Sequence, residues 1–240
     1  MIIARKIFQT ALMGLTLLIP AGRLSCQEKN YREIFGENWN KAETFLSENK
    51  SWIKPALEKY DLGYEESVAV IFPELVRYSS VSDLAETALL KTLYVNLGKE
   101  YADFSVGYFQ MKPSFGEKLG QSAVKLLGRR YYSLVRDSMD FGDKFEYRRA
   151  IIRDLEDEHS QLNYLIVFIR ICSRKFSLGK MTAGERVKFL SSAYNYGFFH
   201  SESEILKMEN RSFFATGIIK RDFYPYSDIS LYWYHLHVAE

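Results

Sequence analysis

Glu74 is the residue whose surroundings are best suited to acid–base chemistry. It lies in the run Ile71-Phe72-Pro73-Glu74-Leu75, which holds no other charge. Burial among apolar side chains favours the neutral form of a carboxyl group and so raises its pKa. A carboxyl group that keeps its proton near neutral pH can donate it to a leaving oxygen, as cleavage of a glycosidic bond requires. Glu74 is therefore a candidate general acid, and the alternative is a solvated glutamate on a helix.

A second group of polar residues lies in the segment 99–112, which has no helical period. Gly107 can adopt a positive φ angle or let the backbone pass close to a ligand. Gln110 carries an amide that donates and accepts hydrogen bonds, so it can bind a sugar or brace the loop. Asp103 is either a second catalytic acid or a structural acid that caps a turn, and the structural role is favoured.

A third group stands at the end of a predicted helix, in the run Ala193–Gly197. Thr182 and Glu185 have the spacing of a capping box, which predicts that the helix begins at the residue after Thr182. The hydroxyl of Tyr194 is placed to orient Glu74 or a bound sugar, and the alternative is a core tyrosine.

Three runs, taken in chain order, resemble the motifs of the soluble lytic transglycosylase family: Pro73-Glu74-Leu75, Gly107-Tyr108-Phe109-Gln110-Met111-Lys112-Pro113 and Ala193-Tyr194-Asn195-Tyr196-Gly197. In that family the motifs read Glu-Ser, Gly-Leu-Met-Gln-x-x-Pro and Ala-Tyr-Asn-Ala-Gly. The resemblance implies an all-α (mainly α), lysozyme-like domain with a short loop or hairpin beside the active-site cleft. It implies Glu74 as the catalytic residue, and as substrate-binding residues Ser105, Gln110, Met111, Tyr194 and Asn195.

The implied activity is that of a peptidoglycan lytic transglycosylase. It cleaves the β-1,4 bond between N-acetylmuramic acid and N-acetylglucosamine in glycan strands and leaves 1,6-anhydro products, with Glu74 as acid and then base. One alternative is a muramidase, a lysozyme-type hydrolase that uses Asp103 as its second carboxylate. Another is a non-catalytic module of the same fold, which binds glycan or a partner in a cell-envelope assembly. A monomer without a cofactor is expected.

The chain also departs from the family pattern. Leu75 replaces the family's serine, which removes a polar contact and makes the surroundings of Glu74 drier. Tyr108-Phe109 replaces Leu-Met. The segment 117–156 is interpreted as an insertion that covers one end of the groove. The match covers residues 64–116 and 158–200, and residues 27–63 and 117–156 fall outside it.

The elements that position these residues are predicted to be helices. An apolar stripe in residues 27–63, made of Trp39, Ala42, Phe45 and Leu46, indicates one or two short helices. Pro55 is expected to interrupt the helical pattern. The next element begins near Tyr64. Pro73 is expected to bend or restart it, which would place Glu74 at an irregularity, aimed into a cleft.

The following helix is predicted from Ser82, a plausible cap, to Leu97, with Gly98 ending it. Asp83 and Glu86 in its first turn complement the helix dipole. Pro113 has the character of a first helical residue. The predicted core side of the helix consists of Leu84, Ala88, Leu93 and Leu97.

Residues 117–156 are charged and helix-prone, with a break at 140–143, and an apolar segment from Ser160 predicts a helix buried on most sides. Cys172 lies in that segment and is interpreted as a buried thiol without a disulfide partner. The last stretch of the chain is rich in aromatic residues.

Composition places the chain among globular proteins, since 47% of the 240 residues are hydrophobic and 26% are charged. Residues 1–26 have the pattern of a secretory signal peptide, in which Arg5 and Lys6 precede an apolar run. A single domain from 27 to 240, exported to the periplasm or cell envelope, is therefore expected. Lipid anchoring through Cys26 is the alternative to simple cleavage.

Three of the 32 basic residues and none of the 30 acidic residues lie in this leader, so the formal net charge of the remainder is −1. The basic residues are interspersed with acids, which argues against a nucleic-acid partner. The four histidines lack the spacing of a metal-binding set, and no metal site is predicted.

Overall fold

The computed structural model describes residues 29–78, 84–215 and 222–238, so the predicted leader and Cys26 lie outside the described residues. The described chain is mainly α-helical with a small two-stranded antiparallel hairpin, which confirms the mainly α prediction. The elements are α1 (Tyr31–Phe35), α2 (Glu37–Glu58), α3 (Tyr64–Tyr78), α4 (Leu84–Leu97), α5 (Pro113–Leu126), α6 (Arg129–Tyr132), η1 (Ser138–Asp140), α7 (Lys144–Glu156), α8 (Glu158–Lys175), η2 (Leu178–Lys180), α9 (Ala183–Tyr196), α10 (Glu202–Met208), β1 (Ser212–Phe214), β2 (Tyr224–Pro225) and α11 (Tyr226–Val238).

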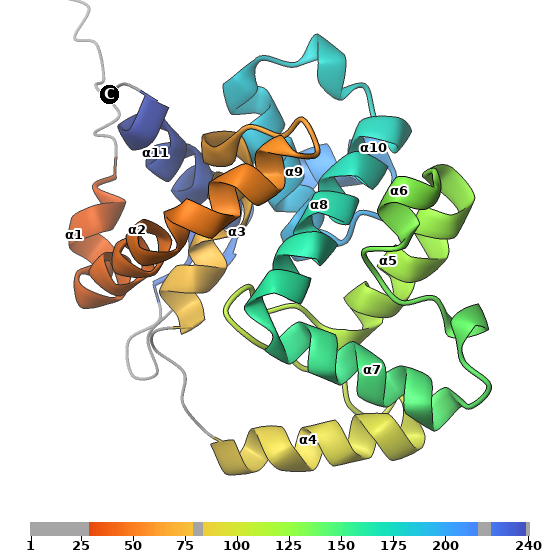
Figure 1. The fold of residues 1–240 in the computed structure, drawn as a ribbon. Coiled ribbons are helices and arrows are strands. Elements are labelled where there is room, and N and C mark those ends of the chain that lie inside the picture. The colour runs from red at the N-terminus through yellow and green to blue at the C-terminus, as the bar shows by residue number, and fades with distance from the viewer. Residues whose placement is uncertain (1–28, 79–83, 216–221, 239–240) are drawn as a thin grey trace, which may run out of the picture. The chain divides into compact units, whose positions relative to one another are not determined.

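Helix α3 is surrounded by other helices: it packs against α2, α9 and α11 (Figure 1). Every residue from Ser67 to Val76 is buried, as expected for a helix that is apolar on all sides. The ring of Phe72 lies 4.5 Å from that of Trp39 in α2 and 5.2 Å from that of Trp233 in α11, centroid to centroid. The carboxyl group of Glu74 is therefore carried by a helix inside the core.

Pro73 was predicted to bend or restart the helix, and the restart is wrong, because α3 runs unbroken from Tyr64 to Tyr78. Proline removes one backbone hydrogen bond but does not prevent a helix that its neighbours hold in place. The Tyr226 hydroxyl of α11 donates to the Val70 carbonyl at 3.1 Å, in the turn before Pro73. A tertiary contact that a local pattern does not reveal thus supports this turn.

Helix α2 differs from prediction in the same way. It is one long helix that continues past Pro55, whereas short helices were expected. Pro55 stands near its C-terminal end, where the carbonyl deprived of a bond belongs to exposed Ser51 and can face water. Trp39, Ala42 and Leu46 are buried as the apolar stripe predicted.

Helix α4 ends at Gly98, as predicted, and this glycine has a φ of 99°. Its predicted core side is confirmed for Leu93, which is partly buried against the core, and wrong for Ala88 and Leu97, which are exposed. The buried residue is Tyr94, whose hydroxyl donates to the buried Glu117 carboxylate at 2.8 Å, so a polar contact decides which side faces the core. Ser82 and Asp83 and the side chains of Leu84 and Glu86 lie outside what the structure describes.

Helices α5, α7 and α8 form a second packed group, with α4 against α7 (Figure 1). The predicted buried helix is α8, and the predicted break in 117–156 falls between η1 and α7. Residues of this segment, including Leu119, Ile151 and Leu155, are fully buried, so the segment is part of the core. The residues predicted to be buried in α8 are buried: Leu162, Leu165, Ile166, Phe168, Ile169 and Cys172.

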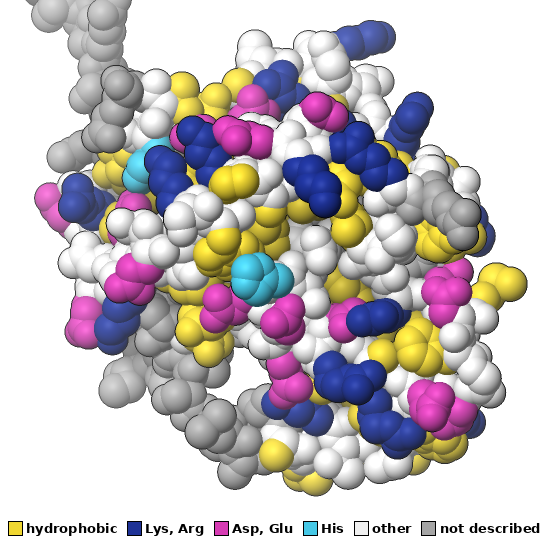
Figure 2. Space-filling model, in the orientation of Figure 1, with side chains coloured by type: hydrophobic (Ala, Val, Ile, Leu, Met, Phe, Trp, Pro, Cys, Tyr) yellow, Lys and Arg dark blue, Asp and Glu magenta, His cyan; other side chains and the backbone are white. Residues whose placement is uncertain are grey.

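The start of α9 confirms the capping box, because Thr182 and Glu185 bond to each other's backbone amides. Pro113 is the first residue of α5, as predicted. Helix α11 and the pairing of β1 with β2 were not predicted, although α11 supplies contacts to both α3 and α9. Among the described residues, no helix combines the length and apolar character needed to cross a membrane. Figure 2 shows basic and acidic side chains interspersed over the face that it draws.

Candidate active site

A pocket of about 290 Å³ is lined by residues of all three sequence motifs. Its walls come from α3, from the loop before α5 and from the end of α9. This volume is near the lower end of the range for small-ligand pockets. The structure thus brings together every residue singled out from the sequence: Glu74, Asp103, Ser105, Gln110, Met111, Tyr194 and Asn195.

Glu74 is only 4% exposed, although it lines the pocket. Burial raises its pKa from 4.5 to about 7, because an ionised carboxylate loses its hydration there. The positive charge of Arg77, a hydrogen bond from Tyr226 and the charge of Lys112 act in the opposite direction. The net effect is a carboxyl group that changes its protonation state near neutral pH, as a general acid must.

Arg77 and Tyr226 contact Glu74, and sequence reasoning missed both. Nη1 of Arg77 lies 3.1 Å from Oε2 and 3.3 Å from Oε1 of Glu74. The three-residue spacing on one helix was a usable sequence indication of this pair. Tyr226 had no such indication, because it reaches Glu74 from α11, more than 150 residues later.

The loop from Val106 to Met111 is a tight turn closed by backbone bonds between these two residues. Gln110 has a φ of 50°, and its Nε2 donates to the Gly107 carbonyl at 2.8 Å. The amide of Gln110 therefore braces the loop, and its side-chain oxygen has no bonding partner among the described residues. That oxygen is available to a ligand in the pocket.

Two buried side chains hold this loop from opposite directions. The Tyr194 hydroxyl donates to the Phe109 carbonyl at 2.7 Å, and the Phe109 amide donates to Oε1 of Gln161 at 2.7 Å. Gly107 has a φ of 69°, and a Cβ there would overlap the Gln161 amide and the Leu155 carbonyl. The backbone at Gly107 therefore passes close to other parts of the protein, Gln161 and Leu155. The Tyr194 hydroxyl therefore positions the loop, whereas the prediction was that it would orient Glu74 or a bound sugar.

Asp103 is exposed and lines the pocket, but both of its carboxylate oxygens are engaged. Oδ1 accepts from the Ser114 backbone amide at 3.0 Å, and Oδ2 accepts from the Ser114 hydroxyl at 2.8 Å. These bonds fix the start of α5, where a carboxylate also complements the helix dipole. They are the bonds of a structural acid.

Other lining residues offer unused groups or an apolar surface. The side chains of Ser105 and Asn195 make no hydrogen bond within the described part of the chain, and both residues line the pocket. Phe199 also lines the pocket and is 47% exposed, and the Lys118 ammonium lies 3.2 Å from the centroid of its ring. Leu75, by contrast, is buried in the core and does not line the pocket, so it dries the surroundings of Glu74 without meeting a ligand.

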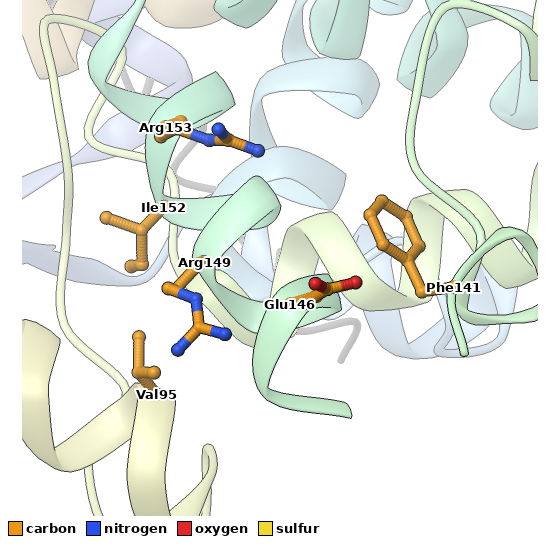
Figure 3. A pocket seen from close by; sticks show the side chains of 6 residues that line it. All are labelled: Val95, Phe141, Glu146, Arg149, Ile152 and Arg153. Atoms are coloured by element: carbon orange, nitrogen blue, oxygen red, sulfur yellow. The ribbon is translucent and has the colours of Figure 1, made fainter. Parts of the chain in front are cut away.

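A larger hollow of about 480 Å³ lies beside α7 and is lined by Val95, Phe141 and Ile152. Figure 3 shows its charged side chains, which belong to α7, pointing in different directions. They are Glu146, Arg149 and Arg153, and all three are exposed. Exposed, diverging charges are poorly suited to acid–base chemistry, so the pocket at Glu74 is the better candidate.

Cys172 is a free, buried thiol whose pKa burial raises further. The described residues hold no group of three or more His, Cys, Asp or Glu side chains that could bind a metal ion. No protein-family model, curated protein or solved structure matches this chain. The likeness to lytic transglycosylases therefore rests on its three motifs and on the pocket at which they meet.

Proposed function

We propose that this protein is an exported peptidoglycan lytic transglycosylase with a lysozyme-like fold. The observation that carries the proposal is the buried Glu74 carboxyl group, with a pKa raised to about 7, in a pocket that it shares with Gln110 and Tyr194. Residues of three motifs that are far apart in the sequence line this one pocket. Glycan binding by the unused groups of Ser105 and Asn195 is consistent with it.

In the proposed reaction, protonated Glu74 gives its proton to the glycosidic oxygen between N-acetylmuramic acid and N-acetylglucosamine. The bond from that oxygen to C1 breaks, and positive charge develops at C1. The Glu74 carboxylate then removes the proton of the sugar's 6-hydroxyl group, whose oxygen bonds to C1. The product is a 1,6-anhydro sugar, and Glu74 is protonated again. No second carboxylate is needed, which agrees with the engagement of Asp103 by Ser114.

Digestion of purified peptidoglycan sacculi tests this activity. The expected soluble products have the mass of 1,6-anhydro-muropeptides. Products heavier by one water, with a reducing end, would instead identify a muramidase. If an Asp103→Asn variant that still unfolds cooperatively no longer released the hydrated products, Asp103 would be the second catalytic carboxylate of a muramidase.

A non-catalytic glycan-binding module is the second candidate, and the ion pair of Glu74 with Arg77 favours it. An arginine beside the acid stabilises its ionised form, which cannot donate a proton. This candidate predicts that the wild-type protein sediments with sacculi and releases no soluble product between pH 5 and pH 8. Release of anhydro-muropeptides in the same experiment excludes it.

A further inference from the structure

Two acidic and two basic side chains line the pocket: Glu74, Asp103, Arg77 and Lys112. With Glu74 ionised, their formal charges cancel. With Glu74 protonated, one positive charge remains in the pocket. The protonated state needed for catalysis is therefore also the state that favours a bound anion.

Arg77 is placed where a ligand can reach it. Its side chain is 29% exposed on the wall of the pocket, while the Glu74 side chain to which it bonds is only 5% exposed. Its guanidinium also lies over the ring of Phe214, 4.7 Å from the centroid, in a cation–π contact. A guanidinium carries five N–H donors in a planar fork, the geometry that a carboxylate matches best.

The charged and titratable groups that act on Glu74 come from several elements. They are Arg77 on α3, Tyr226 on α11, Tyr194 on α9 and Lys112 before α5. Among them the Arg77 charge is the largest influence that lowers the pKa of Glu74, second only to burial, which raises it. A ligand that draws Arg77 away would therefore change the protonation of Glu74 more than the loss of any other single neighbour.

We propose that Arg77 recognises a carboxylate on the glycan, and that its transfer from Glu74 to that carboxylate makes Glu74 take up a proton from solvent. Near neutral pH the acid is then partly ionised in the empty pocket and protonated in the occupied one. The proposal rests on the proposed function for the identity of the glycan. By linkage, a ligand that raises proton affinity must bind more tightly at lower pH.

The carboxylate has two sources in peptidoglycan. It belongs to the lactyl group of N-acetylmuramic acid where no peptide stem is attached, or to the stem itself, whose amide bond uses up the lactyl carboxyl group. A titration of the Glu74 side-chain carboxyl carbon by NMR, with and without saturating sugar, separates them. The probes are N-acetylmuramic acid, N-acetylmuramyl-L-alanyl-D-glutamate and N-acetylglucosamine, which lacks a carboxylate. A higher Glu74 pKa with N-acetylmuramic acid than with N-acetylglucosamine assigns the lactyl carboxylate. A higher pKa with N-acetylmuramyl-L-alanyl-D-glutamate alone assigns the stem. An equal pKa with all three sugars overturns the proposal.

Arg77→Gln supplies the matching variant. It is expected to raise the Glu74 pKa in the empty pocket and to remove the preference for N-acetylmuramic acid over N-acetylglucosamine, a loss of roughly tenfold in relative affinity. Arg149→Gln, an exposed arginine outside the pocket, should leave both unchanged. If Arg77→Gln does not fold, Arg77→Lys keeps the charge but loses the fork and should weaken the preference. An unaltered preference in a folded Arg77 variant contradicts the proposal.

These measurements follow binding and protonation, not turnover. Failure of the inference would leave anhydro-product release by the wild type intact. Failure of the proposed function would appear as absence of that release, whatever the Glu74 titration shows. The two claims therefore fail separately.

Discussion

Burial and charge act on Glu74 in opposite directions, and the balance gives this residue its chemical character. A carboxyl group on a solvated helix face would be ionised at neutral pH, whereas burial in α3 brings its pKa to about 7. Arg77 and Tyr226 keep the pKa from rising further. Because each contribution comes from an identified neighbour, each can be removed and measured.

The pH dependence of stability reports the burial of Glu74. Its pKa in the folded state, about 7, exceeds the ordinary value of 4.5, so the folded protein binds more protons than the unfolded chain between these pH values. The free energy of unfolding should therefore fall as pH rises from 4.5 to 7, with a contribution from Glu74 of about 3 kcal/mol. Urea unfolding of Glu74→Gln should lack that contribution. Glu65→Gln on the same helix should follow the wild type, and identical pH profiles for all three proteins would refute the burial argument.

Tyr226→Phe removes the hydroxyl that donates to the Val70 carbonyl and that also lowers the pKa of Glu74. Without this hydroxyl the pKa of Glu74 should rise. Since the proposed acid must be protonated, the alkaline limb of the pH profile of kcat/KM for glycan cleavage should move to higher pH. Tyr101→Phe, at an exposed tyrosine, is the control and should leave the limb in place. A lower rate with an unshifted limb would mean that Tyr226 acts only through packing and Val70.

At the scale of elements, the pocket depends on how the loop 106–111 is held. Tyr194 binds the loop's backbone from α9 and Gln161 binds it from α8, while Asp103 secures the start of α5. The loop's own turn is closed by the pair Val106 and Met111. Residues that resemble substrate ligands in sequence thus also build the pocket wall.

Gly107→Ala tests this arrangement. A methyl group there would overlap the Gln161 amide and force a side chain into a positive φ. The free energy of unfolding should fall by roughly 2–4 kcal/mol. Gly142→Ala, where a Cβ would have nothing within 4 Å, should change it by less than about 1 kcal/mol. Equal effects in thermal or urea unfolding would show that the loop can move away from Gln161.

Local sequence chemistry predicted some element boundaries and missed others. Thr182 with Glu185, Pro113 and Gly98 each act through their own backbone, so their roles could be predicted. Pro73 was misjudged, because the packing around α3 outweighs a local preference. The buried side of α4 was misjudged because Tyr94 reaches Glu117 on another helix.

At the scale of the whole molecule, the candidate site joins residues that lie more than 100 positions apart. The motifs around Glu74, Gln110 and Tyr194 were predicted to meet, and they line one pocket. Tyr226 could not be predicted, since no pattern near it indicates contact with Glu74. Arg77 could have been, from its spacing. The sequence motifs thus lead to one candidate pocket, and tertiary packing decides the electrostatics within it.

The most direct test of the central claim is release of anhydro-muropeptides from sacculi by wild-type protein and by Glu74→Gln, with Glu65→Gln as the control on the same helix. The account predicts release by the wild type and the control, and a loss of at least about 100-fold in Glu74→Gln, because removing a general acid costs at least that much. Folding of each variant is checked by thermal unfolding. Undiminished release by a folded Glu74→Gln protein would contradict the assignment of Glu74 as the catalytic acid.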